Sequence, residues 1–453
     1  MLVPLLVVSL AGMAPLLAAV PFMRLIGDDY IFAAYSDALG VFPSMALWSD
    51  FYSSPVASFF MFLHGWWAVS VPASLTYWPL SILMVFLAAI TGVLIVGRTT
   101  GIVLDRIQIS VVGVFSISMW LLAMGNLGGD HDTVTLFAQL NWFSASYRSL
   151  LAFAWFLAVL LILFSRVGIP PGVQPLFIPL GVLVSLIALN PLPDLLAYLC
   201  GTVLLALLTQ RFESGDWIRK RTRSLVFLAL GQAVGVVGLL LSPGAAGRRQ
   251  WLSFPPPEEP LAAVTGQIAV FAREAANPSL LLVFAGTCSI VAVLASTDLI
   301  REESPSRSLW ALTWVSTLLI VLLILSGSSN VMVGPGAVWH RWGLQTVAFI
   351  ACLLWGSLAG LRIAQRCARQ RIGLLAVAVV CSSISVVPSM SAMLLIMDRE
   401  TSWENGDSEV MYIWDKRMFA DCWAVLQDGG SGNSNSRFVP VNPCRDLRSE
   451  PPV

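Results

Sequence analysis

Residues 75–97 read LTYWPLSILMVFLAAITGVLIVG, and residues 98–106, which follow, read RTTGIVLDR. The first stretch has no charged residue and is long enough to cross a bilayer, which takes about 20 apolar residues in a helix. The second stretch is short and carries Arg98 and Arg106, which is typical of a loop on the cytoplasmic side of a membrane. This pairing of an apolar span with a short arginine-bearing loop recurs along the chain and decides the fold class.

The composition agrees with a chain built for lipid. Hydrophobic residues make up 57% and charged residues 11% of the 453 residues, and the mean hydropathy is +0.80, whereas about 25% of a soluble domain is charged. We therefore predict an all-α membrane protein with about eleven transmembrane helices, with membrane lipids and no nucleic acid among its partners. The predicted spans are 2–22, 75–97, 107–124, 148–165, 174–190, 194–209, 224–242, 279–297, 308–326, 342–361 and 374–396.

Arginine-bearing segments orient these spans. Segments 98–106, 210–223, 298–307 and 362–372 all fall on one side of the membrane if there are eleven spans. The other side then carries more acidic than basic residues. We predict a multi-pass protein of the plasma or inner membrane, with a cytoplasmic N-terminus and an extracytoplasmic C-terminus. No basic residues precede the first apolar run, so we expect an uncleaved first helix.

Residues 53–71, SSPVASFFMFLHGWWAVSV, are also apolar enough to span. Counting them would reverse every later loop and place the arginines outside. Because tryptophan favours the depth of the membrane interface, the pair Trp66 and Trp67 indicates an interfacial or re-entrant helix in a long first outer loop.

The predicted organisation has two parts, a polytopic domain at 1–396 and an extracytoplasmic tail or small cap at 397–453. From the sequence of the tail we predict a helix near 410–427 and a short strand at 437–441. Cys422 and Cys444 both fall in this tail. An oxidising compartment permits a disulfide between them, although their spacing alone does not establish one.

Asp28 and Asp29, in LIGDDYIFAAYSDALG (25–40), stand where the first helix reaches water. A carboxylate at a membrane boundary loses part of its solvation, which favours the protonated form. Such a group suits general-base catalysis on an alcohol that lies within hydrogen-bond distance. The same residues are also compatible with a solvated pair that marks the helix end.

A second polar cluster follows the third predicted span, in GNLGGDHDTVTLFAQLNWFSASY (125–147). Asp130, His131 and Asp132 can bind a divalent cation such as Mg²⁺ or Mn²⁺, position an acceptor, or form a plain polar loop. Asn141 and Trp142 start the next helix, where an aromatic ring stacks on a sugar or lies in the interface belt.

Two further turns place basic pairs on the predicted outer side. SPGAAGRRQW (242–251) holds Arg248 and Arg249, and GPGAVWHRWG (334–343) holds His340 and Arg341. Arginine suits phosphate because its planar fork makes two hydrogen bonds at once. Lipid headgroup binding is the alternative interpretation. The spans themselves carry almost no ionisable residues, which disfavours an ion-coupled transporter.

Together these features resemble the GT-C class of membrane glycosyltransferases. The resemblance rests on a first span followed by the acidic pair in GDDYIFA, a long loop with interfacial helices, the acidic cluster GGDHDT, the SPGAAGRRQW and GPGAVWHRWG turns and the outer YIWDKR (412–417). It covers most of the chain, although no long outer domain follows the last span.

The resemblance implies an enzyme that moves a sugar from a polyprenyl-phosphate carrier to a hydroxyl acceptor, a glycan or a lipid, on the outer face. It places the base at Asp28 or Asp29, with Asp28 preferred. Arg248, Arg249 and Arg341, with His340 beside them, would bind the phosphate of the donor. Some members use a divalent cation, to which Asp130 and Asp132 can contribute. The alternatives are a lipid or polysaccharide transporter or flippase, and a non-catalytic scaffold for envelope assembly.

Overall fold

The computed structural model describes most of the apolar part of the chain. The described residues are 2–23, 29–49, 54–125, 143–163, 169–187, 193–212, 216–245, 277–297, 341–366, 370–404, 423–426 and 437–440, with single residues and short pieces between 259 and 269 and between 314 and 325. Within these ranges the chain is helical apart from two short strands and a few turns.

The elements follow one another from the N-terminus to the C-terminus. They are α1 (Val3–Ala19), η1 (Val20–Phe22), α2 (Asp29–Leu39), α3 (Val41–Leu47), α4 (Pro55–Ser70), η2 (Ala73–Leu75), α5 (Trp78–Thr99), α6 (Arg106–Gly125), α8 (Phe143–Leu163), η3 (Gln174–Leu176), α9 (Phe177–Leu186), α10 (Pro193–Phe212), α11 (Asp216–Leu240), α14 (Pro278–Thr297), α16 (Arg341–Arg366), α17 (Arg371–Ile384), α18 (Val386–Glu404), β1 (Trp423–Leu426) and β2 (Arg437–Pro440).

Nine helices in the described ranges are long and apolar enough to cross a bilayer. They lie where nine of the spans were predicted. An apolar segment that crosses a membrane alone is helical, because a helix satisfies all of its backbone hydrogen bonds internally. α17 and α18 form one of them, Arg371–Met397. The prediction at 174–190 corresponds to the shorter stretch Gln174–Leu186, and the one at 308–326 is only partly described.

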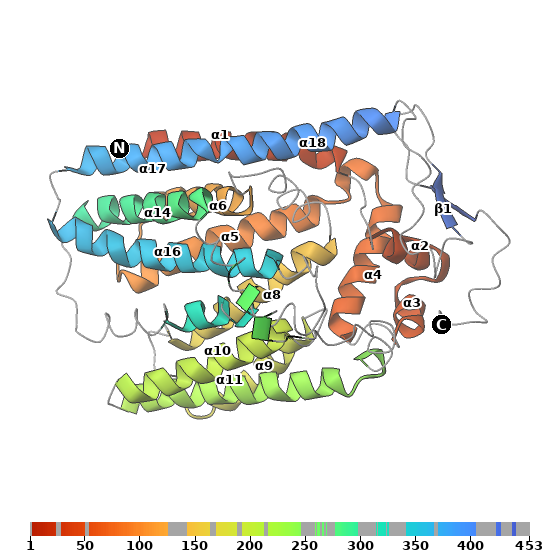
Figure 1. Cartoon of the computed structure of the whole chain (residues 1–453), viewed down its shortest axis with the longest axis horizontal. Coiled ribbons are helices and arrows are strands. Elements are labelled where there is room, and N and C mark those ends of the chain that lie inside the picture. Colours follow the sequence, from red (N-terminus) through yellow and green to blue (C-terminus); the bar gives the residue numbers. More distant parts are fainter. Residues whose placement is uncertain are drawn as a thin grey trace.

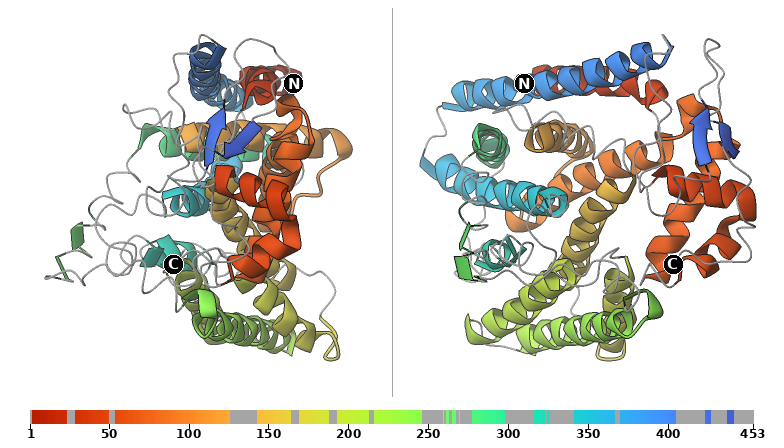
Figure 2. Two further views of the ribbon diagram at one scale, coloured as in Figure 1. Left: turned by 90° about the vertical axis from the view of Figure 1, so that its right-hand side faces the viewer. Right: turned by 45° about the vertical axis from the view of Figure 1, so that its right-hand side comes forward.

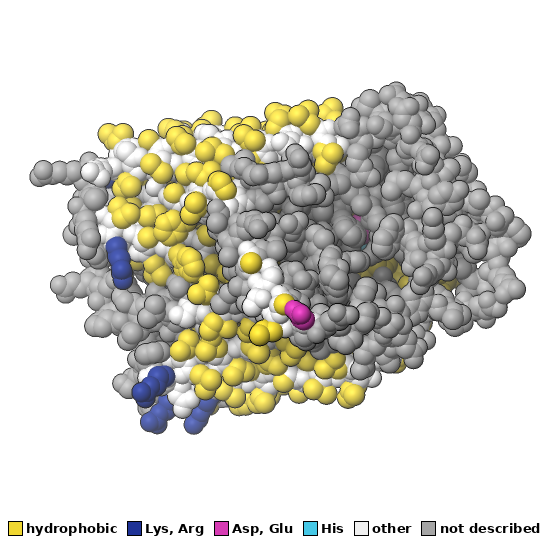
Figure 3. All heavy atoms as spheres, viewed as in Figure 1, with side chains coloured by type: hydrophobic (Ala, Val, Ile, Leu, Met, Phe, Trp, Pro, Cys, Tyr) yellow, Lys and Arg dark blue, Asp and Glu magenta, His cyan; other side chains and the backbone are white. Residues whose placement is uncertain are grey.

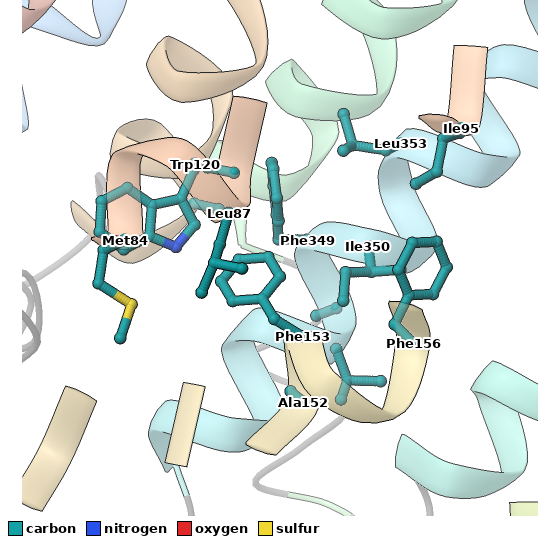
Figure 4. Close-up of a cluster of buried hydrophobic side chains, with 14 of the residues drawn as sticks. Met84, Leu87, Ile95, Trp120, Ala152, Phe153, Phe156, Phe349, Ile350 and Leu353 are labelled. Carbon is teal, nitrogen blue, oxygen red and sulfur yellow. The ribbon is translucent and has the colours of Figure 1, made fainter. Parts of the chain in front are cut away.

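The long helices form a bundle with two edges (Figure 1). α1, α17 and α18 lie along one edge and α9, α10 and α11 along the other, with α5, α6, α8, α14 and α16 between them. Figure 4 shows how the middle helices meet, with Trp120 of α6, Phe153 and Phe156 of α8 and Phe349 of α16 gathered with Leu87 of α5 in one buried cluster.

Glycines let the neighbouring helices approach closely. In α11, a Cβ on Gly231 would collide with the carbonyl of Ile178 in α9, and Gly181 of α9 lies against the Leu228 carbonyl in the same way. In α16, a Cβ on Gly356 would come within 2.8 Å of Thr287 in α14. Small residues serve this purpose in membranes, because lipid supplies no hydrophobic force to hold helices together.

The short helices α2, α3 and α4 lie together at one end of the bundle, where α4 runs across the direction of the long helices (Figures 1 and 2). α4 has 16 residues, so it is about 24 Å long and shorter than the roughly 30 Å hydrocarbon core. It is not among the nine apolar spans of the described ranges.

The opposite end of the bundle, which we call the basic end, holds Arg98, Arg106, Arg219 and Arg371 at the ends of α5, α6, α11 and α17. The Lys and Arg side chains that Figure 3 shows on this face gather there. The bundle therefore has two chemically different ends, one basic and one built around α2–α4.

Two antiparallel strands occur in the tail. β2 falls where a strand was predicted, with Phe438 opposite Val425. β1 lies inside the range predicted as a helix, so that prediction is wrong for Trp423–Leu426. The sequence WAVL is apolar and short, and pairing with RFVP gives its backbone groups partners that an isolated short helix would not supply.

We predict that Gly231→Leu destabilises the bundle, because the new side chain must push α9 and α11 apart. Such overpacking costs about 1–3 kcal/mol. The matched control is Gly238→Leu in the same helix, since nothing lies within 4 Å of a Cβ at that position. Thermal unfolding in detergent should show a lower melting temperature for Gly231→Leu alone. Equal melting temperatures for both variants would contradict this packing.

Candidate functional site

Asp29 is the residue of the predicted acidic pair that the structure describes. It is the first residue of α2, and its side chain is 0% exposed. The hydroxyl of Tyr77 donates a hydrogen bond to Asp29 Oδ2 at 3.0 Å. Tyr77 is itself fully buried and is the N-cap residue of α5. One hydrogen bond thus joins the start of the first short helix to the start of a long span.

His64 of α4 adds an imidazole to this pair. Its ring lies 5.3 Å from the Tyr77 ring, measured between centroids. Burial lowers the pKa of His64 to about 3, because a desolvated imidazolium is costly. The histidine is therefore neutral at physiological pH, and the three side chains combine a carboxyl, a phenol and a neutral imidazole.

Close packing fixes α4 against α2. A Cβ on Gly65 would collide with the backbone of Phe32, so only glycine lets the two helices approach this closely. Ser36 Oγ donates a hydrogen bond of 2.7 Å to the Phe62 carbonyl, and the Phe32 and Phe62 rings meet edge to face at 5.2 Å. The α2–α4 unit therefore holds the Asp29–Tyr77–His64 group between tightly packed helices.

A second buried polar group lies where α8, α10 and α16 start. Arg148 and Asp194 form an ion pair at 3.7 Å, with 6% and 8% of their side chains exposed. On the same helices, Thr346 Oγ1 donates to Ser149 Oγ at 2.9 Å, and the rings of Trp155 and Tyr198 lie 5.2 Å apart.

Sequence analysis did not select the pair Arg148–Asp194 as a site. A signal was present, because opposite charges occupy the first residues of two predicted spans, 148–165 and 194–209. Partial burial at the same membrane boundary favours such pairing. Phe60 of α4 contacts Tyr147 of α8 with centroids 6.5 Å apart, so the α2–α4 unit reaches the helix that carries Arg148.

Most of the predicted site residues lie outside the described ranges. These are Asp28, Asp130, His131, Asp132, Asn141, Trp142, Arg248, Arg249, His340, Cys422 and Cys444. Arg341 opens α16. Gly343, two residues later, lies close to the second polar group, because a Cβ there would be 3.9 Å from both the Arg148 carbonyl and the Tyr198 hydroxyl. The start of α16 and the Arg148–Asp194 pair are therefore neighbours.

The described part of the chain does not include the predicted metal and disulfide residues. It contains no group of three or more His, Cys, Asp or Glu residues that could hold a metal ion. Its four cysteines, Cys200, Cys288, Cys352 and Cys381, are free thiols.

The fold and these polar groups define a class: the chain is a multi-pass membrane protein of apolar helices, with buried polar groups at the α2–α4 end of its bundle. Comparison with family models, curated proteins and solved structures finds no match for this chain. Function must therefore be argued from the residues themselves.

We predict that Arg148→Ala or Asp194→Ala alone lowers the free energy of unfolding by about 3–5 kcal/mol, since each leaves a buried charge without its counter-ion. The double variant Arg148→Met/Asp194→Leu should be less destabilised than either single variant, because it leaves no such charge. Denaturant titration in mixed micelles measures all three proteins. Additive losses in the double variant would contradict a direct ion pair.

The lowered pKa of His64 leads us to predict that the stability of the protein depends on pH. The unfolded chain binds a proton at His64 below about pH 6.5, whereas the folded protein does so only near pH 3. Stability should therefore fall as the pH drops from 6.5 towards 3, by up to about 1.4 kcal/mol per pH unit from this group. His64→Gln should remove that component and match the wild type above pH 7. Parallel melting curves for the two proteins from pH 7 to 5 would refute the assignment.

Proposed function

We propose that this protein is a membrane glycosyltransferase that moves a sugar from a polyprenyl-phosphate carrier to a hydroxyl acceptor, a cell-envelope glycan or glycolipid, on the outer face of the membrane. The observation that carries the proposal is the buried carboxylate of Asp29, which accepts a hydrogen bond from Tyr77 at the start of the short helices α2–α4. A carboxylate at that place can organise acid–base chemistry at the membrane surface, where a lipid-linked donor and a polar acceptor meet.

The location of charge supports an enzyme over an ion-coupled transporter. In the nine apolar spans, as far as the chain is described, the buried charged residues are Arg148, Asp194 and Arg221. Each lies within the first three residues of its span. A transporter usually needs charged or protonatable groups near the bilayer midplane, and the described spans hold no Asp, Glu, Lys, Arg or His there. The polar chemistry is concentrated at the helix ends instead.

The burial of Asp29 supports different proposed roles for the two acids. A fully buried carboxylate bonded to a tyrosine has little direct access to substrate, so the general base is its neighbour Asp28. Asp28 accepts the proton of the acceptor hydroxyl while the acceptor oxygen attacks the anomeric carbon. The bond from that carbon to the carrier phosphate breaks, which inverts the anomeric centre, and the phosphate leaves with the bonding electrons.

Basic side chains would stabilise this leaving group. Charge grows on the phosphate as the glycosidic bond breaks, so arginines fixed in advance favour the transition state more than the ground state. Arg248, Arg249, His340 and Arg341 are the proposed donor-binding residues. The position of Arg341 at the start of α16, beside the Arg148–Asp194 pair, is consistent with a donor site at this end of the bundle.

Orientation in the membrane is part of the proposal. With eleven spans, including 174–190 and 308–326, the basic end faces the cytoplasm, and the α2–α4 end and the C-terminal tail face outwards. The arginines at the basic end support this choice through the positive-inside rule. Asp130 and Asp132 remain candidates for binding Mg²⁺ or Mn²⁺.

We predict that Asp28→Asn lowers the rate of sugar transfer by about 10²–10⁴-fold, the contribution of a general base. Asp37→Asn, an exposed position in α2, should leave the rate unchanged. The assay uses purified protein in nanodiscs with radiolabelled undecaprenyl-phosphate glucose or mannose and a membrane-glycan extract as acceptor. Mass spectrometry of lipid-linked glycans in a deletion strain complemented with each variant provides the same comparison in cells.

The competing interpretations predict different outcomes. Wild-type transfer by protein carrying both Asp28→Asn and Asp29→Asn would contradict the proposed function, which rests on these acids. A wild-type protein that transfers no sugar would leave a scaffold, for which neither acid matters to the lipid-linked glycans of the complemented strain. Absence of transfer together with blocked movement of the lipid-linked sugar across the membrane in the deletion strain would favour a flippase.

A further inference from the structure

Tyr77 takes no direct part in the proposed reaction, yet its hydroxyl is bonded to Asp29. It lies 48 residues after Asp29 in the sequence and is the N-cap residue of α5, which is one of the long spans of the bundle. α2, by contrast, belongs to the short-helix unit outside the spans. The bond between the Tyr77 hydroxyl and Asp29 Oδ2 therefore ties the start of α2 to a rigid element of the bundle.

This hydrogen bond is buried inside the protein. Asp29 and Tyr77 are both 0% exposed, and His64, which packs on the Tyr77 ring, is kept neutral by burial. A hydrogen bond is electrostatically stronger in such an environment than in water, and losing one partner is correspondingly costly. The tyrosine hydroxyl thus contributes more to the placement of Asp29 than it would at the surface.

Asp29 also lies in the first turn of α2, where a carboxylate is favoured by the helix dipole. That effect operates at an exposed position and needs no tyrosine from another helix. The helix dipole alone therefore explains the presence of an acid but not its burial or its bond to Tyr77.

We propose that Tyr77 is a positioning residue: by holding Asp29, it fixes the start of α2, the helix that directly follows the proposed base Asp28 in the sequence. This inference rests on the proposed function. Catalytic groups must be held within a fraction of an ångström, and a displacement of about 1 Å can cost about 100-fold in rate.

The test is a double-mutant cycle on transfer kinetics. Tyr77→Phe keeps the ring that packs on His64 and removes only the hydroxyl. We expect it to lower kcat roughly tenfold to a hundredfold at unchanged KM for the undecaprenyl-phosphate sugar. Asp29→Asn should lower kcat to a similar extent, and adding Tyr77→Phe to it should cause little further loss, because both changes act through one bond.

The matched control is Tyr35→Phe, which removes a hydroxyl from a buried tyrosine of α2 that packs edge to face on Trp48. It should retain the wild-type kcat. Melting temperatures of all variants are measured in the same nanodiscs. If Asp29→Asn does not fold, the kinetics of Tyr77→Phe alone test the proposal. A fall in kcat at unchanged KM and melting temperature then supports a positioning role.

The possible failures are distinguishable. A wild-type kcat in Tyr77→Phe would overturn the role of Tyr77, and so would losses that multiply in the double variant. If Asp28→Asn is inactive in the same assay, the proposed function still stands. A wild-type protein that transfers neither sugar, or activity that survives both aspartate changes, would overturn the proposed function and this inference with it.

Discussion

Hydrocarbon offers no hydrogen-bond partner, and this constraint shapes the whole molecule. Each polar group within the bilayer must find a partner inside the chain or move to a helix end. Some serines find a partner inside the bundle: Ser9 Oγ and Ser382 Oγ lie 2.6 Å apart between α1 and α17, and Ser118 Oγ donates to the Ser9 carbonyl. Charged residues lie at helix ends instead, with Arg148 and Asp194 paired at the start of their spans.

This division leaves the interior of the bundle to packing and to hydrogen bonds between uncharged groups. Aromatic side chains fill the space among α5, α6, α8 and α16, and glycines allow α9 to approach α11 and α14 to approach α16. Such an interior is well suited to a rigid support and poorly suited to a charged pathway. Chemistry is then confined to the bundle ends, where irregular segments such as α2–α4 can place polar groups without facing lipid.

The spans were predictable because their signal is local. An apolar run of about 20 residues identifies itself, and nine of the predicted spans have matching helices. Residues 53–71 are equally apolar and were set apart from the spans by a whole-chain argument, because counting them would place the arginine-bearing loops outside; the tryptophan pair then indicated an interfacial helix. The strand at 423–426 was missed because its partner, β2, is distant in the sequence.

The polar contacts were harder to predict, because they join residues that are far apart in the chain. Nothing in the sequence around Asp29 indicates that Tyr77 will be its partner. The sequence around His64 indicates only that it belongs to an apolar helix. Only the folding of α4 onto α2 and the start of α5 brings the three together. The acid was found from its position after the first span, while its burial and its partner required the structure.

The proposed function requires that the α2–α4 end of the bundle faces outwards and the basic end faces the cytoplasm. Cysteine labelling tests this directly in a variant without the seven native cysteines, using the exposed positions Asp37→Cys and Arg219→Cys. A membrane-impermeant maleimide added to intact cells should label Asp37→Cys and should reach Arg219→Cys only after permeabilisation. The reverse pattern would place the acidic site in the cytoplasm and contradict the account.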